Sequence, residues 1–109
     1  MAKGIFLVEN SPCSPEREAE FNQWYDEVHL PEMCAVEGVV SARRFAGAAG
    51  EMTYVTVYEL EADDLDGVRA AISAAAVNGD IHMSDSIRKD PPSRFRILRT
   101  IGEYAPDQA

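Results

Sequence analysis

The chain has 109 residues, which is the size of a single domain built around one core. Hydrophobic residues make up 46% of it and charged residues 27%, a balance that excludes a disordered chain. With 19 acidic and 10 basic residues, the formal net charge is −9. This charge disfavours nucleic acid and anionic membrane surfaces as partners, because proteins bind both through basic residues.

The cellular compartment is predicted from what the sequence lacks. No apolar run reaches the roughly 18 residues that a membrane-spanning helix needs. Glu9 and Asn10 interrupt the first apolar run before it could form the core of a signal peptide. We therefore expect a cytoplasmic protein in which Cys13 and Cys34 are free thiols.

The first predicted element is a short strand at residues 4–9. Side chains alternate between the two faces of a strand, so Phe6 and Val8 share one face while Ile5 and Leu7 share the other. Both faces are apolar. In a chain this short, one layer of helices covers only one face of a sheet, so the second apolar face predicts a homodimer.

A helix is predicted to begin at Ser-Pro in positions 14–15, because Ser is a common N-cap and Pro is tolerated in the first turn. Pro31 predicts that this helix ends or bends near Leu30. At about 100° per residue, the helix carries one apolar stripe. The stripe consists of Phe21, Trp24, Tyr25 and Val28.

The rest of the chain predicts three strands and one helix. The strands lie at residues 39–45, 52–60 and 93–101, and the helix runs from Asp63 or Asp64 to Asn78. For residues 80–92 the sequence allows two structures, a short helix or a mobile flap. Residues 102–109 are predicted to be a loose tail or arm.

The resulting order, β-α-β-β-α-β, is that of the ferredoxin-like fold. The fold class is therefore α+β, with an antiparallel sheet that carries both helices on one face. One domain would span residues 1–109, and two such sheets closing on each other would form a dimeric α+β barrel.

A recognisable set of residue types lies within residues 21–60. It comprises Trp24-Tyr25-x-x-x-His29-x-Pro31, then Gly38, Ala42-Arg43-Arg44-Phe45 and Tyr58-Glu59-Leu60. Together these residues resemble the EthD-like branch of the dimeric α+β barrel superfamily, although Glu37 stands where relatives often carry Pro. The resemblance implies the fold and a homodimer. For function it implies a wide range: cofactor-free cyclases and isomerases, cofactor-free oxygenases, haem-degrading enzymes and members without known activity.

His29 is the first candidate for chemistry. Regular helical geometry places it about 80° from Phe21, at the margin of the buried stripe. Tyr25 and Asp26 lie one turn before it, and either could orient it. A neighbouring carboxylate would raise its pKa and burial would lower it, which would keep it near neutrality as a general acid or base. The alternative is that His29 only caps the helix C-terminus.

Three further residues could contact a substrate or serve only the fold. Trp24 could form a pocket wall or pack in the core with its N–H on one partner. Tyr58 could donate a hydrogen bond to a bound carbonyl or remain a core residue. His82 belongs to residues 80–92 and could reach a ligand, although the surface is its default position.

The adjacent residues Arg43 and Arg44 point to opposite faces of their strand. We assign Arg44 to the helix side, where it could neutralise a substrate carboxylate or enolate. The other arginine would face solvent or an ion pair between subunits. Glu9 could pair with Arg44, which would make that arginine structural.

The first functional hypothesis is a small enzyme that needs no cofactor and moves a proton α to a carbonyl, as in isomerisation or cyclisation. Its substrate would be apolar, aromatic or polyketide-like, as in secondary metabolism or aromatic catabolism. The alternatives are an oxygenase, either cofactor-free or haem-dependent, and a non-catalytic dimeric ligand-binding or accessory protein. No metal site is expected, because no ligand spacing is recognisable around either His.

Overall fold

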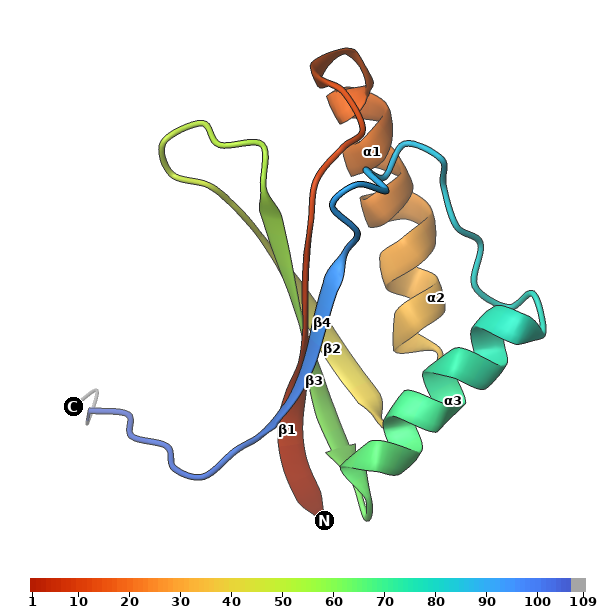
Figure 1. Cartoon of the computed structure of the whole chain (residues 1–109). Coiled ribbons are helices and arrows are strands. Elements are labelled where there is room, and N and C mark those ends of the chain that lie inside the picture. The colour runs from red at the N-terminus through yellow and green to blue at the C-terminus, as the bar shows by residue number, and fades with distance from the viewer. Residues whose placement is uncertain (107–109) are drawn as a thin grey trace.

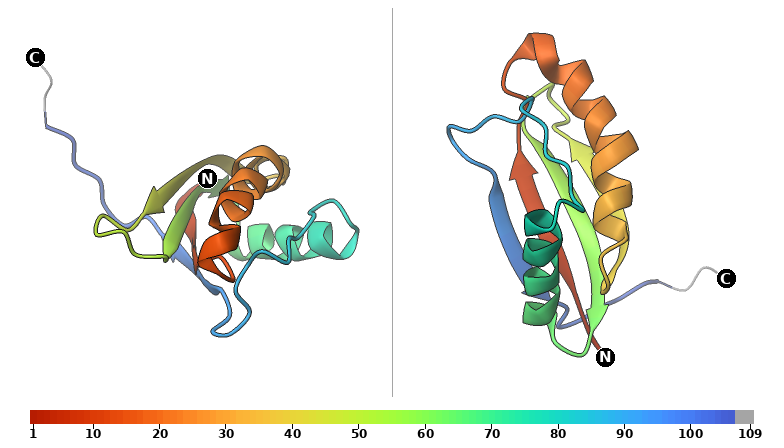
Figure 2. Two further views of the ribbon diagram at one scale, coloured as in Figure 1. Left: turned by 90° about the horizontal axis from the view of Figure 1, so that it is seen from above. Right: turned by 90° about the vertical axis from the view of Figure 1, so that its right-hand side faces the viewer.

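The computed structural model describes residues 1–106. Within them, four strands form one antiparallel sheet in the order β2-β3-β1-β4. The strands are β1 (Ala2–Asn10), β2 (Val39–Ala46), β3 (Tyr54–Ala62) and β4 (Arg94–Arg99). All helices lie on one face of this sheet (Figures 1 and 2). The structure confirms the predicted α+β ferredoxin-like fold.

The two faces of the sheet differ in how they are covered. On β1, Phe6 and Val8 point toward the helices and are buried, whereas Ile5 and Leu7 point to the other face and stay partly exposed. Residues that pair directly across neighbouring strands point to the same face, so the pairing of the strands identifies the other members of this open face. Its apolar members are Ile5, Leu7, Phe45, Val55, Val57 and Leu98.

One continuous helical segment joins β1 to β2. It consists of a 3-10 turn (Pro15–Arg17), α1 (Glu18–Trp24), a π-helical turn (Tyr25–His29) and α2 (Leu30–Cys34). The helix therefore does not end near Leu30, which corrects that half of the prediction, and the helical type changes from π to α between His29 and Leu30. Pro31 lies in the first turn of α2, where a missing N–H is tolerated.

The π-turn changes which residues face the sheet. In an α-helix, four steps of about 100° exceed one full turn by about 40°, so residues four apart do not lie directly above one another. A π-turn rotates the chain by fewer degrees per residue and thereby reduces this offset. Residues 21, 25, 29 and 33 consequently share one face. Phe21, Tyr25, His29 and Met33 are all buried there, at 0%, 1%, 9% and 3% exposure.

The last helix, α3 (Leu65–Val77), begins as the sequence indicates. Asp64 is its N-cap and accepts a hydrogen bond from the Asp66 backbone N–H at 3.1 Å. At the entrance to β2, Gly38 has φ +98, and a Cβ there would lie 2.7 Å from Cγ2 of Val68. Only glycine fits this close approach of the chain to α3.

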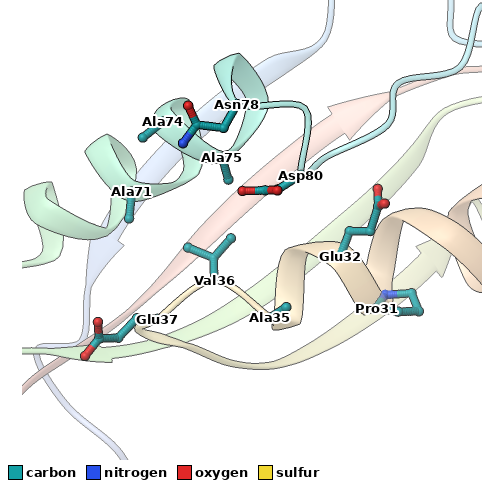
Figure 3. A pocket seen from close by; sticks show the side chains of 10 residues that line it. All are labelled: Pro31, Glu32, Ala35, Val36, Glu37, Ala71, Ala74, Ala75, Asn78 and Asp80. Carbon is teal, nitrogen blue, oxygen red and sulfur yellow. The ribbon is translucent and has the colours of Figure 1, made fainter.

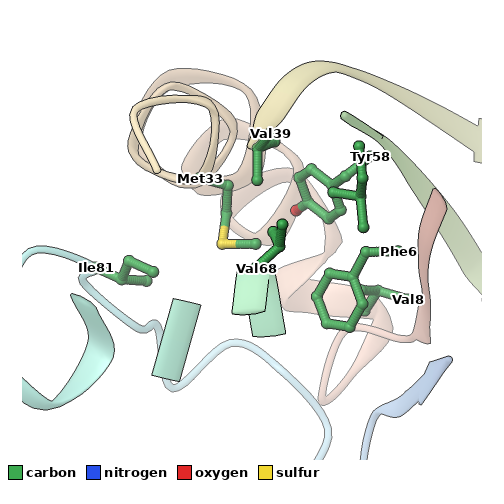
Figure 4. Close-up of a cluster of buried hydrophobic side chains, with 8 residues drawn as sticks. Phe6, Val8, Met33, Val39, Tyr58, Val68 and Ile81 are labelled. Atoms are coloured by element: carbon green, nitrogen blue, oxygen red, sulfur yellow. The ribbon is translucent and has the colours of Figure 1, made fainter. Parts of the chain in front are cut away.

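The buried side chains form two clusters. The larger one lies between the sheet, α2 and α3 and comprises Phe6, Val8, Met33, Val39, Tyr58, Leu60, Val68 and Ile81 (Figure 4). The smaller one comprises Phe21, Tyr25 and Ile87. The first helical segment therefore supplies residues to both clusters.

Residues 80–92, which we call the strap, form no helix, which corrects the first of the two alternatives. Ile81, Ser86 and Ile87 are buried. The backbone N–H of Cys13 donates to the carbonyl of Ser86 at 2.7 Å, which ties the strap to the start of the helical segment. The strap thus closes one side of the space between helices and sheet.

After β4 the described chain has no further helix or strand and runs away from the sheet (Figure 1). Ile101 and Tyr104 are 87% and 90% exposed. Of the predicted tail, residues 107–109 lie outside the described residues. No helix within residues 1–106 is long and apolar enough to cross a membrane.

Candidate active site

A cavity of about 160 Å³ lies between the sheet, the helical segment and the strap. Its walls are mainly apolar, with polar atoms supplied by Asn10, Trp24, Tyr25, His29 and Ser93. Among the described residues that line it there is no Asp, Glu, Lys or Arg. His29 is therefore the group of this cavity whose ordinary pKa lies closest to neutrality.

His29 is held between two aromatic rings. The Trp24 ring stacks on the imidazole with centroids 4.5 Å apart, and the Tyr25 ring meets it edge-on at 5.1 Å. The Nδ1 atom is buried and has no hydrogen-bond partner among the described residues. An unpaired buried nitrogen is costly, so a ligand that satisfies it would bind favourably.

Burial lowers the pKa of His29 to about 4. The nearby Glu32 carboxylate opposes this shift, and the Arg44 guanidinium adds to it. The sequence predicted a pKa near neutrality and a position at the margin of the stripe. Both differ in the structure, because the π-turn rotates His29 fully inward and no carboxylate hydrogen-bonds to it.

Asn10 and Tyr25 form the polar end of the cavity. The Asn10 side-chain N–H donates to Oη of Tyr25 at 3.0 Å, which leaves the Tyr25 hydroxyl proton available to another acceptor. The Asn10 Oδ1 atom is buried without a partner among the described residues. At this end of the cavity, the Asn10 Oδ1 atom and the Tyr25 hydroxyl proton are thus not paired with each other.

Asp26 and Arg44 lie on the other side of Tyr25, outside the cavity. Arg44 donates to Asp26 at 3.0 Å and to Asn22 at 2.8 Å, and its guanidinium lies 4.3 Å from the centroid of the Tyr25 ring. Arg44 is on the helix side, as predicted. Asp26 contacts Arg44 and does not contact the imidazole, so Tyr25 alone of the two predicted partners lies against His29.

Tyr58 lies deeper, in the larger core cluster (Figure 4). It is fully buried, and its Oη has no hydrogen-bond partner among the described residues. Burial raises its pKa, and the neighbouring Tyr25 adds to this. Its ring does not line the cavity, so the structure places Tyr58 in the core and not at the ligand.

Trp24 and His82 connect the helical segment to the strap. The indole N–H of Trp24 donates to the His82 carbonyl at 3.0 Å. The His82 backbone N–H and Nδ1 both lie against the Glu32 carboxylate, at 2.7 and 2.6 Å. His82 itself is exposed, so its side chain holds the strap from outside and does not enter the cavity.

Glu9 does not pair with Arg44, which corrects the expectation from the sequence. Its side chain shares the open face with Ile5 and Leu7, whereas Arg44 points to the helix face. Glu9 instead lies 3.9 Å from Arg94 on the neighbouring strand. Arg43, also on the open face, pairs with Glu59 at 3.5 Å.

A larger hollow of about 670 Å³ lies between α2 and α3 (Figure 3). Alanines and Val36 form most of its floor, and Glu32, Glu37 and Asp80 lie around it. None of its lining residues has an imidazole, thiol or hydroxyl group. The groups that could act on a ligand are thus at the smaller cavity. Within residues 1–106, no three His, Cys, Asp or Glu side chains lie close enough together to hold a metal ion.

No model of a protein family and no curated protein matches the sequence. Solved structures match the fold. A monooxygenase from the gene ActVA-Orf6 of Streptomyces coelicolor, in complex with the ligand nanaomycin D, is 14% identical with a TM-score of 0.64, over 97% of this chain and 94% of that one. An ethyl tert-butyl ether D (EthD) family protein from Bacillus halodurans is 16% identical with a TM-score of 0.57, over 94% and 99%. Rv0793 from Mycobacterium tuberculosis is 15% identical with a TM-score of 0.56, over 94% and 99%.

The chain therefore shares its α+β fold with these proteins.

Within this ferredoxin-like fold, the structure brings Trp24, Tyr25 and His29 together in one cavity. It places the other predicted site residues elsewhere: Glu9, Asp26, Arg44, Tyr58 and His82. Asn10 was not predicted, because the first predicted strand ended at residue 9, whereas β1 includes Asn10. The alternation Phe6, Val8, Asn10 along β1 is the signal that would have found it.

Proposed function

We propose that this protein is a small enzyme that binds an apolar or aromatic carbonyl compound in the His29 cavity and that His29 removes a proton from it. The observation that carries the proposal is an imidazole held between two aromatic rings, with Nδ1 unpaired among the described residues, in a cavity without charged residues. With a pKa of about 4, His29 is in its proton-accepting form throughout the physiological range. The reaction would need no cofactor.

The polar end of the cavity supports this assignment. When a C–H bond next to a carbonyl breaks, its proton passes to the imidazole and its electron pair moves onto the carbonyl oxygen. The Tyr25 hydroxyl, held by Asn10 at 3.0 Å, can donate a hydrogen bond to that oxygen. The imidazolium then returns the proton to another carbon, which is an isomerisation. Alternatively, the enolate carbon attacks a second carbonyl of the same molecule, whose oxygen takes the electron pair of its C=O bond and then the proton of the imidazolium, which is a cyclisation.

The test is proton exchange with solvent. A panel of aromatic ketones is incubated with the protein in deuterated water, and NMR measures loss of the α-proton signal. His29→Gln should slow exchange by about 100-fold or more, the range lost with a general base. Glu27→Gln is the matched control, because Glu27 is exposed in the same π-turn. Circular dichroism checks folding, and undiminished exchange in folded His29→Gln would refute the assignment and leave the non-catalytic ligand-binding role.

A second candidate is oxygenation of an electron-rich phenol, favoured by the likeness to a monooxygenase. The same neutral imidazole could remove the phenolic proton that makes such a ring reactive toward oxygen. Oxygen consumption with phenolic substrates separates this reaction from isomerisation. A haem group does not fit within the His29 cavity alone, because about 160 Å³ is less than the roughly 300–1,000 Å³ of pockets for drug-sized ligands.

We propose further that the protein is a cytoplasmic homodimer in which two open sheet faces pack together. The support is the apolar strip on the face without helices, where Leu7 and Val57 lie side by side and stay partly exposed. Phe45 on the same face is 48% exposed. Such a face is normally covered by a second layer.

A further inference from the structure

A second hollow, of about 440 Å³, lies beside the His29 cavity. The two share four lining residues, which are Phe6, Ile72, Ala76 and Phe95. They are therefore neighbouring parts of one groove on the helix face of the sheet. We call the His29 cavity the inner part and this hollow the outer part. The outer part adds Arg69 and Ser73 of α3 to the lining.

The groove is built for flat apolar groups. The rings of Phe6 and Phe95 are stacked 5.8 Å apart and nearly parallel, at 9°, and Phe95 is 56% exposed beside the groove. The inner part, at about 160 Å³, is close in size to an apolar cavity of about 150 Å³ that holds benzene. One six-membered ring therefore fits beside His29, and the remainder of a larger ligand must extend past Phe95.

Charge differs sharply between the two parts. The inner lining has no Asp, Glu, Lys or Arg among the described residues, and the outer lining has one charged residue, Arg69. Within residues 1–106, the Arg69 guanidinium has no ion pair or hydrogen bond. Arg44, by contrast, is paired with Asp26 and covered by Tyr25. Arg69 is thus the cation of the groove that is available to a ligand.

We propose that the ligand of this groove is an aromatic carboxylate whose ring lies beside His29 and whose carboxylate binds Arg69. The inference rests on the proposed function of the inner part and adds the substrate class. A neutral imidazole does not attract an anion, whereas the Arg69 guanidinium does. We therefore expect the carboxylate at the outer end of the groove. Both hollows lie on the helix face, so dimerisation through the open sheet face would leave them accessible.

The test compares two probes that differ only in charge, 1-naphthylacetate and 1-naphthylacetamide, with the full chain at pH 7. Calorimetry measures affinity. Fluorescence of Trp24, the single Trp of the chain and a neighbour of His29, reports occupation of the inner part. Arg69→Gln should weaken naphthylacetate about threefold or more and leave naphthylacetamide unchanged, as expected for loss of one ion pair. Lys89→Gln is the control, since Lys89 is exposed and lines neither part.

The inference is overturned if naphthylacetate and naphthylacetamide bind the native protein equally, if neither binds, or if Arg69→Gln changes neither affinity. Binding of both probes with a Trp24 response but without any effect of Arg69 would leave the proposed function standing. Conversely, Arg69-dependent binding together with unchanged proton exchange in His29→Gln would refute the proposed function while supporting the carboxylate site.

Discussion

At the scale of single residues, burial decides the chemistry of His29. The sequence contains a carboxylate one turn before it, Asp26, and that neighbour suggested a raised pKa. In the fold, Asp26 pairs with Arg44, and the imidazole is left between Trp24 and Tyr25. A His in such surroundings is unprotonated at neutral pH, so it can accept a proton from a ligand but has none on its second nitrogen to donate.

This burial predicts a pH dependence of stability. The unfolded chain binds a proton at His29 near the ordinary pKa of 6.5, and the folded protein does so only near 4. Between these values the unfolded state binds more protons, so the free energy of unfolding falls as the pH drops from 6.5 to 4. The loss from this group is about 3 kcal/mol.

Urea denaturation of the native protein and of His29→Gln at pH 7.0 and pH 4.5 isolates this effect, because the other titrating groups are common to both. The variant should gain about 2–3 kcal/mol relative to the native protein at the lower pH. A difference between the two proteins that is the same at both pH values would contradict the burial of a neutral imidazole.

At the scale of elements, the strap is fixed to the helical segment at two places, at Asp85 through Arg17 and at His82 through Glu32 and Trp24. Glu32 accepts the His82 backbone N–H at 2.7 Å, and its other oxygen lies 2.6 Å from His82 Nδ1. Trp24 adds one hydrogen bond to the His82 carbonyl. Since Ile81 and Ile87 of the strap wall the inner cavity, these contacts also control how closed the cavity is.

Glu32→Ala should therefore loosen the strap. Losing the carboxylate removes the acceptor of the His82 N–H, and amide exchange over residues 80–92 should become roughly three- to tenfold faster, the worth of one or two hydrogen bonds. Hydrogen exchange followed by mass spectrometry measures this. Glu37→Ala, at an exposed acid after α2, is the control. Equal protection of the strap in both variants would show that its buried isoleucines hold it without Glu32.

The elements themselves could be predicted from the sequence because their signals are local. Asp64 caps α3 where an Asp was expected, and alternation along β1 gave the two faces of the sheet. The π-turn has no comparable signal, since it is stabilised by the packing of Tyr25, His29 and Met33 against the sheet. The site depends on that turn, so the sequence named His29 and Tyr25 but not their surroundings. The strap, held by contacts between distant residues such as Glu32 and His82, was beyond local patterns for the same reason.

At the scale of the whole molecule, the helices cover one face of the sheet and leave the other face, with its apolar strip, open. Substituting Val57 by Glu places a charge in the middle of the open face, next to Leu7. Size-exclusion chromatography with light scattering should find the native protein at twice its chain mass of 12.0 kDa and Val57→Glu at or near the single-chain mass. Ala70→Glu, on the exposed side of α3, should remain dimeric. A native protein that elutes as a single chain would refute the proposed interface.

The π-turn has a consequence for how the two halves of the core depend on each other. Phe21, before the turn, belongs to the smaller cluster, and Met33, after it, belongs to the larger one. The π-turn changes the rotation about the helix axis between these two residues, so both side chains face the sheet. A regular α-helix of the same length would direct one of them away from it. The two clusters therefore depend on the length of the π-turn. Deleting one residue from it would rotate one end of the helical segment, so that either Phe21 or Met33 would leave its cluster.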